Sequence, residues 1–252
     1  MKPSDIRILV VDDEPLILES VSYLFKSFQF NVDTAPSGNI AWTFLERNSY
    51  DLILSDIRMA DGDGLELVKK VKARNVIKPG FLFMTGFSDV LNEQIYHLGA
   101  EGKFTKPFNI SAVRTAIEAC LLAPEAKWAQ ALPSSKMMTI EKRARTLASL
   151  EHEKLVIFGR GGFFIEHSFS LPEKGKSISF TIKVESPTPM TFQGVGVIRW
   201  TQTSGKANVP QGLGIEITHL PIDQAKIYNE LFGKKISFIP SLAKKGQDNF
   251  AA

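Results

Sequence analysis

The stretch that decides the fold runs Tyr50-Asp51-Leu52-Ile53-Leu54-Ser55-Asp56-Ile57-Arg58-Met59. Four of its first five residues are apolar or aromatic, which is typical of a strand buried on both faces of a parallel sheet. The strand ends on the carboxylate of Asp56. Because ligands of open α/β sheets lie beyond the carboxyl ends of the strands, we expect function to centre on Asp56.

Strand-like and helix-like segments alternate on both sides of this stretch. Further strands are expected at Ile6–Val11, Asn31–Ala35, Gly80–Thr85 and Gly102–Thr105. Helices are expected from Pro15, after the capping Ser37, near Leu65–Val71, around Val90–Leu98 and over Ser111–Leu121. This alternation predicts an α/β fold with a doubly wound, five-stranded parallel sheet.

Polar residues follow the predicted strands at one edge of this sheet. They are Asp12, Asp13, Asp56, Thr85 and Lys106. Carboxylates a few ångströms apart repel by about 4 kcal/mol per pair at an effective dielectric constant near 20, so the site must hold a proton or recruit a cation. A hard divalent ion such as Mg²⁺ suits oxygen ligands, and the hydroxyl and ammonium groups suit phosphoryl oxygens. The cluster therefore predicts transfer of a phosphoryl group to Asp56.

Residues 5–122 resemble the receiver domain of two-component response regulators. The resemblance is carried by Asp12-Asp13, by Asp56 within Asp-Ile-Arg-Met, by Thr85 within Met-Thr-Gly and by Lys106-Pro107-Phe108. It implies a flavodoxin-like fold and a response regulator of a phosphorelay, in which a sensor histidine kinase or phosphotransfer protein supplies the phosphoryl group. The chain would then be a phosphoacceptor with at most slow autodephosphorylation, not an enzyme in the usual sense.

The resemblance also implies a role for each site residue. Asp56 would be the phosphoacceptor; Asp13 would bind Mg²⁺ directly, Asp12 through water, and the backbone carbonyl of Arg58 would be a further ligand. Thr85 and Lys106 would contact the phosphoryl group, and Phe104 would follow Thr85 as an aromatic switch. Taken singly, the acidic pair is also compatible with a helix cap, Lys106 with a surface charge and Phe104 with a core residue. One departure from the family pattern is Ala60, where a proline is usual.

A break in composition separates the halves of the chain. Residues 1–123, the expected receiver domain, carry 13 Lys/Arg and 16 Asp/Glu, whereas residues 124–252 carry 17 and 11. Residues 124–152 are expected to form a linker and a connecting helix, capped by Ser134-Ser135 and running to about Glu151, with a narrow apolar stripe. That helix would be a structural strut, or would transmit a signal by packing on a domain or on a second copy of itself in a homodimer.

The periodicity changes after Lys154. Strands are expected at Leu155–Phe158, Phe163–Glu166, Ser177–Val184, Phe192–Thr201 and Gly212–Thr218, followed by a helix from Pro221. Short strands separated by Gly, Pro and Ser predict a small antiparallel β-barrel over residues 153–240, with a flexible tail at 241–252.

This barrel resembles a PilZ domain. The resemblance is carried by Gly161-Gly162-Phe163-Phe164-Ile165, Leu171-Pro172-Glu173-Lys174-Gly175, Gly196-Val197-Ile198-Arg199-Trp200 and Gly212-Leu213-Gly214-Ile215-Glu216-Ile217. Such domains bind cyclic di-GMP through Arg-x-x-x-Arg and Asp/Asn-x-Ser-x-x-Gly motifs.

The nucleotide-binding motifs are degraded in this chain. Ile157 and Gly159 stand where Asp/Asn and Ser belong, and no Arg-x-x-x-Arg precedes the barrel. We therefore expect output by contact with another, unidentified protein. The alternative is a cyclic di-GMP effector that uses Arg143, Arg145 or Arg160 in a non-standard site.

Composition excludes several other classes. No apolar run approaches the roughly 20 residues that span a bilayer, and the amino terminus has no signal-peptide pattern, so membrane insertion is not expected. A single cysteine, Cys120, fits a reducing, cytoplasmic location. No helix-turn-helix pattern follows residue 123, so DNA binding is not expected.

Overall fold

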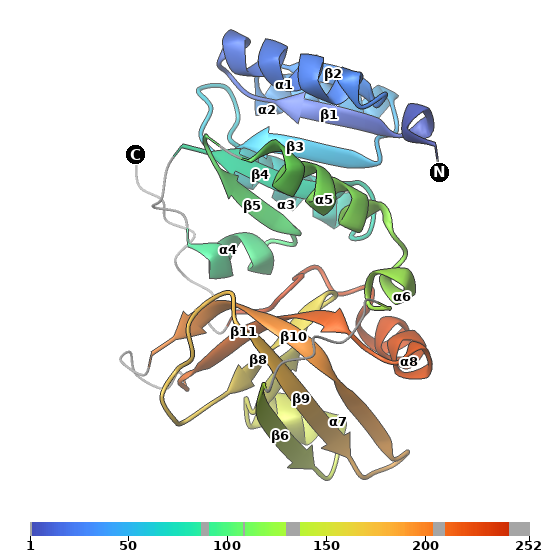
Figure 1. Cartoon of the computed structure of the whole chain (residues 1–252), viewed down its shortest axis with the longest axis vertical. Helices are drawn as coiled ribbons and strands as arrows, with labels where there is room; N and C mark the ends of the chain where they lie inside the picture. The colour runs from blue at the N-terminus through green and yellow to red at the C-terminus, as the bar shows by residue number, and fades with distance from the viewer. Residues whose placement is uncertain (1, 87–90, 108, 130–136, 204–209, 242–252) are drawn as a thin grey trace.

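A computed structural model describes residues 2–86, 91–107, 109–129, 137–203 and 210–241, and the chain forms two sheets with helices around them (Figure 1). None of the helices in these ranges has both the length and the apolar character needed to cross a bilayer. The expected flexible tail lies, apart from Ser241, outside the described residues.

The first sheet is parallel throughout, with strand order β2-β1-β3-β4-β5. Its strands are β1 (Arg7–Val11), β2 (Asn31–Ala35), β3 (Leu52–Asp56), β4 (Gly80–Thr85) and β5 (Gly102–Thr105). A short 3₁₀ helix, η1 (Pro3–Asp5), precedes them. The predicted five-stranded, doubly wound parallel sheet is confirmed.

Helices cover both faces of this sheet (Figure 1). They are α1 (Pro15–Ser27), α2 (Gly38–Arg47), α3 (Gly64–Arg74), α4 (Asn92–His97) and α5 (Ile110–Leu121). Alternate residues of each strand enter two separate hydrophobic clusters: Ile8 and Val10 pack with α1 and α5, whereas Leu9 and Val11 pack with the side that carries α2, α3 and α4. Burial on both faces explains the continuous apolar run of β3.

The second sheet has six strands in the order β6-β9-β10-β11-β8-β7. They are β6 (Met138–Ala144), β7 (Val156–Phe158), β8 (Gly162–Glu166), β9 (Ser177–Val184), β10 (Met190–Gln202) and β11 (Gly212–His219). The helices of this half are α6 (Pro124–Lys127), α7 (Leu147–His152) and α8 (Ile222–Phe232). Tyr228 and Phe232 of α8 are buried in the core against Phe158 and Phe192, so α8 packs on the hydrophobic core of this half.

Two expectations for the second half need correction. The helix expected up to Glu151 is wrong over residues 138–144, which form β6, whereas its last residues belong to α7; the capping Ser134-Ser135 lies outside the described residues. Ile140 is buried between the exposed residues Thr139 and Glu141, which is the alternation of a strand. Pairing with β9 thus outweighs the helical spacing of apolar residues in this segment. The sheet is also not purely antiparallel: β6 and β9 are parallel, and no pairing among the described strands closes a barrel between β6 and β7.

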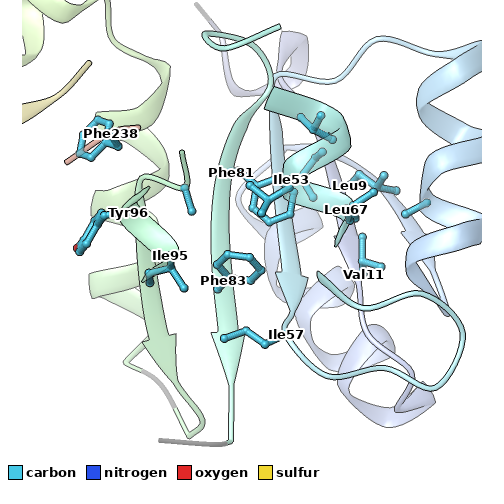
Figure 2. Packing of buried hydrophobic residues seen from close by; sticks show 14 of the residues in the cluster. Leu9, Val11, Ile53, Ile57, Leu67, Phe81, Phe83, Ile95, Tyr96 and Phe238 are labelled. Atoms are coloured by element: carbon cyan, nitrogen blue, oxygen red, sulfur yellow. The ribbon is translucent and has the colours of Figure 1, made fainter. Parts of the chain in front are cut away.

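The two halves share one hydrophobic cluster. It contains Ile95 and Tyr96 of α4 together with Trp200 of β10 and Phe238, which follows α8. Figure 2 shows the Tyr96 and Phe238 rings beside each other, at the side of the first sheet where α4 lies. The receiver-like half therefore contacts the second half through α4.

Candidate functional site

Adjacent parallel strands bring three carboxylates together. Val11, the last residue of β1, is paired with Ser55 of β3, so the residues that follow this pair, Asp12 and Asp56, lie at the same edge of the sheet. Oxygen atoms of Asp12, Asp13 and Asp56 lie within 4.8 Å of one another. Asp12 and Asp56 are buried, whereas Asp13 is exposed. The structure thus forms the acidic cluster that the sequence predicts.

Lys106 enters this cluster from the residue after β5. Its Nζ donates to Asp12 Oδ2 at 2.6 Å and lies 3.7 Å from Asp56 Oδ2. Its backbone N–H donates to the carbonyl of Thr85 at 2.8 Å, which holds the two strand ends in register. The ammonium group is therefore placed to sense charge on Asp56 while it is paired with Asp12.

Burial dominates the chemistry of Asp56. Burial raises the pKa of this carboxyl from 3.8 to about 6. The positive charge of Lys106 and a hydrogen bond from the backbone N–H of Ile57 act in the opposite direction and lower the pKa, whereas the negative charges of Asp12 and Asp13 raise it further. Asp56 Oδ1 is buried and has no hydrogen-bond partner among the described residues. A buried anion with an unsatisfied oxygen favours binding of a proton or a cation.

This donor set fits Mg²⁺. The ion prefers carboxylate, carbonyl and water oxygens and keeps several waters. Asp13 is exposed, and Asp56, whose carboxylate lies in the same cluster, has one oxygen without a hydrogen-bond partner among the described residues. Arg58 is exposed, and its backbone carbonyl is the candidate ligand that the sequence proposes.

Thr85 and Phe104 lie next to the acidic cluster on β4 and β5. Met84 is paired with Asp56 on one side and with Phe104 on the other, and Thr85 is the next residue after it. Thr85 is fully buried. The half-buried Phe104 packs against the hydrophobic cluster that lies between the sheet and helices α1 and α5. Both residues are thus close in register to Asp56, and their switching role remains a prediction.

Two further residues shape the site and were not among the expected site residues. Glu14 lies 3.8 Å from Lys106 Nζ through its Oε1 and donates its backbone N–H to Asp12 Oδ1. A Cβ on Gly64 would collide with the carbonyl oxygen of Asp56, so a glycine is needed where α3 begins against the end of β3. The unbroken run Asp12-Asp13-Glu14 and the glycine-containing loop after Asp56 were the available signals.

The three arginines of the alternative nucleotide site are in different environments. Arg143 is exposed on β6 and paired with Glu141, and Arg145 is exposed after the same strand. Arg160 is buried against the first half of the chain, where its side chain is 7% exposed. The described residues thus provide no common surface for the three guanidinium groups.

Comparison with known proteins agrees with this geometry. The family model for the response regulator receiver domain matches residues 8–118. The probable transcriptional regulatory protein TcrX of Mycobacterium tuberculosis is 32% identical over 118 residues, 46% of this chain and 50% of that protein. The alkaline phosphatase synthesis transcriptional regulatory protein PhoP of Bacillus subtilis is 32% identical over 136 residues, 54% of this chain and 55% of that protein. The matches thus span about half the length of these relatives.

Solved structures match over a similar share of the chain. The response regulator protein TrrA of Thermotoga maritima, solved in complex with Mg²⁺ and BeF, is 28% identical. The match covers 46% of this chain and 99% of that one, with a TM-score of 0.42.

Proposed function

We propose that the whole chain is a two-component response regulator that accepts a phosphoryl group on Asp56, since residues 8–118 match the family model for the response regulator receiver domain. The observation that carries this proposal is the buried, partly unsatisfied Asp56 carboxylate between Asp12, Asp13 and Lys106. With a pKa of about 6, this carboxyl is mostly ionised at pH 7 and can act as a nucleophile.

The residues of the site divide the chemistry among them. A carboxylate oxygen of Asp56 attacks phosphorus, a P–O bond forms, and the bond from phosphorus to the donor breaks and leaves its electrons on the donor. Bound Mg²⁺, held by Asp13, Asp56 and the backbone carbonyl of Arg58 with Asp12 acting through water, would neutralise charge on the phosphoryl oxygens. Lys106 would then exchange Asp12 for a phosphoryl oxygen, and Thr85 would move toward another, followed by the Phe104 ring.

The donor side and the output side involve different partners. The receiver domain would take its phosphoryl group from a histidine kinase or a phosphotransfer protein. The printed names of several relatives refer to transcriptional regulation, but the matches leave much of those proteins uncovered. In this chain the described helices of the second half, α6, α7 and α8, are separated by strands, which gives no helix-turn-helix. We therefore assign the output to protein–protein contact.

The second half fits a PilZ-like role without a nucleotide. Its curved six-stranded sheet and the helix α8 are compatible with that fold. Burial of Arg160, together with the position of Arg143 on β6 and of Arg145 directly after it, argues against a cyclic di-GMP site. Calorimetry of the full chain with cyclic di-GMP should show no binding heat.

The proposed phosphorylation is tested on the full chain. Incubation with acetyl phosphate and Mg²⁺ should add one phosphoryl mass to the native protein and none to Asp56→Asn, as read by intact-protein mass spectrometry. Asp61→Asn is the matched control, because Asp61 is an exposed carboxylate in the loop that follows β3. An Asp56→Asn protein that still gains the mass, or a native protein that never does, would refute the proposal.

A further inference from the structure

A buried serine directly precedes Asp56 near the end of β3. Ser55 is fully buried, and in the strand register it lies between Val11 of β1 and Phe83 of β4. Ile53 belongs to the same hydrophobic cluster as Val11 and Phe83, on the side of the sheet that carries α2, α3 and α4 (Figure 2). Because side chains two residues apart lie on the same face of a strand, Ser55 places a hydroxyl group in an otherwise apolar row.

The hydroxyl group of Ser55 is bonded to the backbone of the next residue. Its Oγ donates to the carbonyl of Asp56 at 2.7 Å, and this hydrogen bond is itself buried. A buried hydroxyl group costs free energy unless it is hydrogen-bonded, and an apolar row needs no hydroxyl for its packing. The geometry therefore assigns the hydroxyl group to the backbone of the residue that would accept phosphate.

The peptide unit between Asp56 and Ile57 links this hydrogen bond to the carboxyl group of Asp56. The carbonyl that accepts from Ser55 and the N–H of Ile57 belong to one peptide unit, and this N–H donates to the side chain of Asp56. A donor at the carbonyl oxygen polarises the peptide unit and strengthens the hydrogen bond that its N–H makes. The hydroxyl group of Ser55 thus acts on the carboxylate through a single peptide unit.

The start of α3 holds the same segment from the other side. The backbone N–H of Gly64 donates to the carbonyl of Ile57 at 2.8 Å. A Cβ on Gly64 would collide with the carbonyl oxygen of Asp56 and would lie 3.0 Å from Ser55 Oγ. Two consecutive carbonyls are therefore fixed by donors, and the end of β3 has little room to shift. A small residue without a hydroxyl group would also fit in this space, so size and hydrogen bonding have to be tested separately.

We propose that Ser55 is a positioning residue for phosphoryl transfer: through the peptide unit between Asp56 and Ile57, its hydroxyl group holds the attacking carboxylate in place. This inference rests on the proposed function of Asp56. A nucleophile that is already held in its reactive geometry loses less freedom on the way to the transition state. Loss of the hydroxyl group should therefore slow the transfer without changing which residue is modified.

The rate of transfer is measured on the full chain, as the gain of mass with acetyl phosphate and saturating Mg²⁺. Ser55→Ala keeps the space and removes the hydroxyl group, and it should react about tenfold more slowly than the native protein. Ser55→Thr and Ser55→Val have nearly the same shape, and Ser55→Thr, which keeps a hydroxyl group, should react several-fold faster. Ser27→Ala removes an exposed hydroxyl group that donates to the carbonyl of Leu24, and it should react at the native rate.

A second measurement follows the hydrogen bond itself, without metal or phosphoryl donor. The amide proton of Ile57, observed by NMR in the full chain, should move upfield in Ser55→Ala and Ser55→Val, because its peptide unit is less polarised. In Ser55→Thr it should stay near the native position. A serine that only fills space would give Ser55→Thr and Ser55→Val the same Ile57 shift, which would overturn the inference.

The outcomes distinguish this inference from the proposed function. If the native protein reacts, and Ser55→Ala reacts equally fast, the positioning role is overturned and phosphorylation of Asp56 stands. If Ser55→Thr and Ser55→Val are slowed equally while urea denaturation shows both to be folded, the added methyl group causes the effect and the hydroxyl group has no such role. A native protein that gains no phosphoryl mass would refute the proposed function, and the positioning role with it.

Discussion

Lys106 donates a hydrogen bond to Asp12 and forms a longer ion pair with Asp56: its Nζ lies 2.6 Å from Asp12 Oδ2 and 3.7 Å from Asp56 Oδ2. Asp12 has both oxygens engaged, the other accepting from the backbone N–H of Glu14. The lysine charge is thus held inside the acidic cluster by a carboxylate that is itself fixed. A cation and Lys106 must therefore compete for the same negative charge.

The first prediction follows from this competition. Lys106→Met removes a positive charge close to the carboxylates, so Mg²⁺ should bind more tightly, by about 1 kcal/mol or about fivefold in Kd. Isothermal titration calorimetry measures the change. Lys26→Met removes an exposed lysine of α1 and should leave the affinity unchanged. Equal or weaker binding by Lys106→Met would show that the lysine does not oppose the metal.

The second prediction concerns the stability of the metal-free protein. Burial raises the pKa of Asp56 from 3.8 to about 6, so the folded state binds a proton more tightly than the unfolded chain. Proton binding to Asp56 therefore stabilises the folded state; this stabilisation is complete below pH 3.8 and is lost as pH rises through about 6. Asp56→Asn should remove this loss and raise the free energy of unfolding at pH 7.5 by about 1–3 kcal/mol.

Urea denaturation in EDTA at pH 5 and pH 7.5 measures this effect. The gap between Asp56→Asn and the native protein should be larger at pH 7.5 than at pH 5. Asp61→Asn, at an exposed carboxylate whose pKa is lowered by hydrogen bonds from Asn39 and Ser37, should not stabilise the protein at pH 7.5. A gap that is independent of pH would assign the stabilisation to something other than the charge of Asp56.

The sequence predicted the receiver sheet and its acidic cluster because the signals are local. Strands β1, β3 and β4 are short apolar runs, and Asp12, Asp56 and Lys106 end or directly follow a strand of this sheet. Parallel topology then brings strand ends together without further information. By contrast, residues 138–144 carry both a helical stripe and an alternating pattern, and only pairing with β9 selects the strand.

The contact between the two halves could not be predicted in the same way. Arg160 lies between two glycines and reads as part of a turn, and its acceptors are far away in the sequence. Lys72 did carry a signal, since it follows Val68 by one helical turn on the buried face of α3. A lysine on an apolar face needs a buried partner, but the sequence does not identify Glu101 as that partner.

The third prediction tests the turn that presents Arg160. Tyr228 Oη donates to the carbonyls of Gly159 and Gly162, at 3.1 and 2.8 Å, and is fully buried. Tyr228→Phe removes the donor and leaves a buried carbonyl short of a partner, which should lower the free energy of unfolding by about 1–2 kcal/mol. Tyr23→Phe, at an exposed tyrosine of α1, should change nothing in the same urea titration. An unchanged midpoint for Tyr228→Phe would mean that water replaces the hydroxyl.

The last prediction concerns Lys72, a fully buried cation beneath the interface. Its Nζ donates to Glu101 Oε1 and to the carbonyls of Val76 and Pro79. Lys72→Met keeps much of the apolar volume and removes the charge, so Glu101 would keep only Arg160 as an ion-pair partner. The free energy of unfolding should fall by about 2–4 kcal/mol, since one partner of a buried ion pair is removed.

The pH dependence separates the charge of Lys72 from its packing. Burial opposes ionisation of Glu101, but Lys72 and Arg160 outweigh it and lower the pKa of this carboxyl. The resulting stability is present above the unfolded pKa of 4.5 and is lost as pH falls through the folded value. Lys72→Met should therefore lose less stability than the native protein between pH 6 and pH 3 in urea titrations. Lys69→Met changes an exposed lysine of α3 and should show the same loss of stability in acid as the native protein. If Lys72→Met also shows the native loss of stability in acid, Arg160 alone sets the ionisation of Glu101.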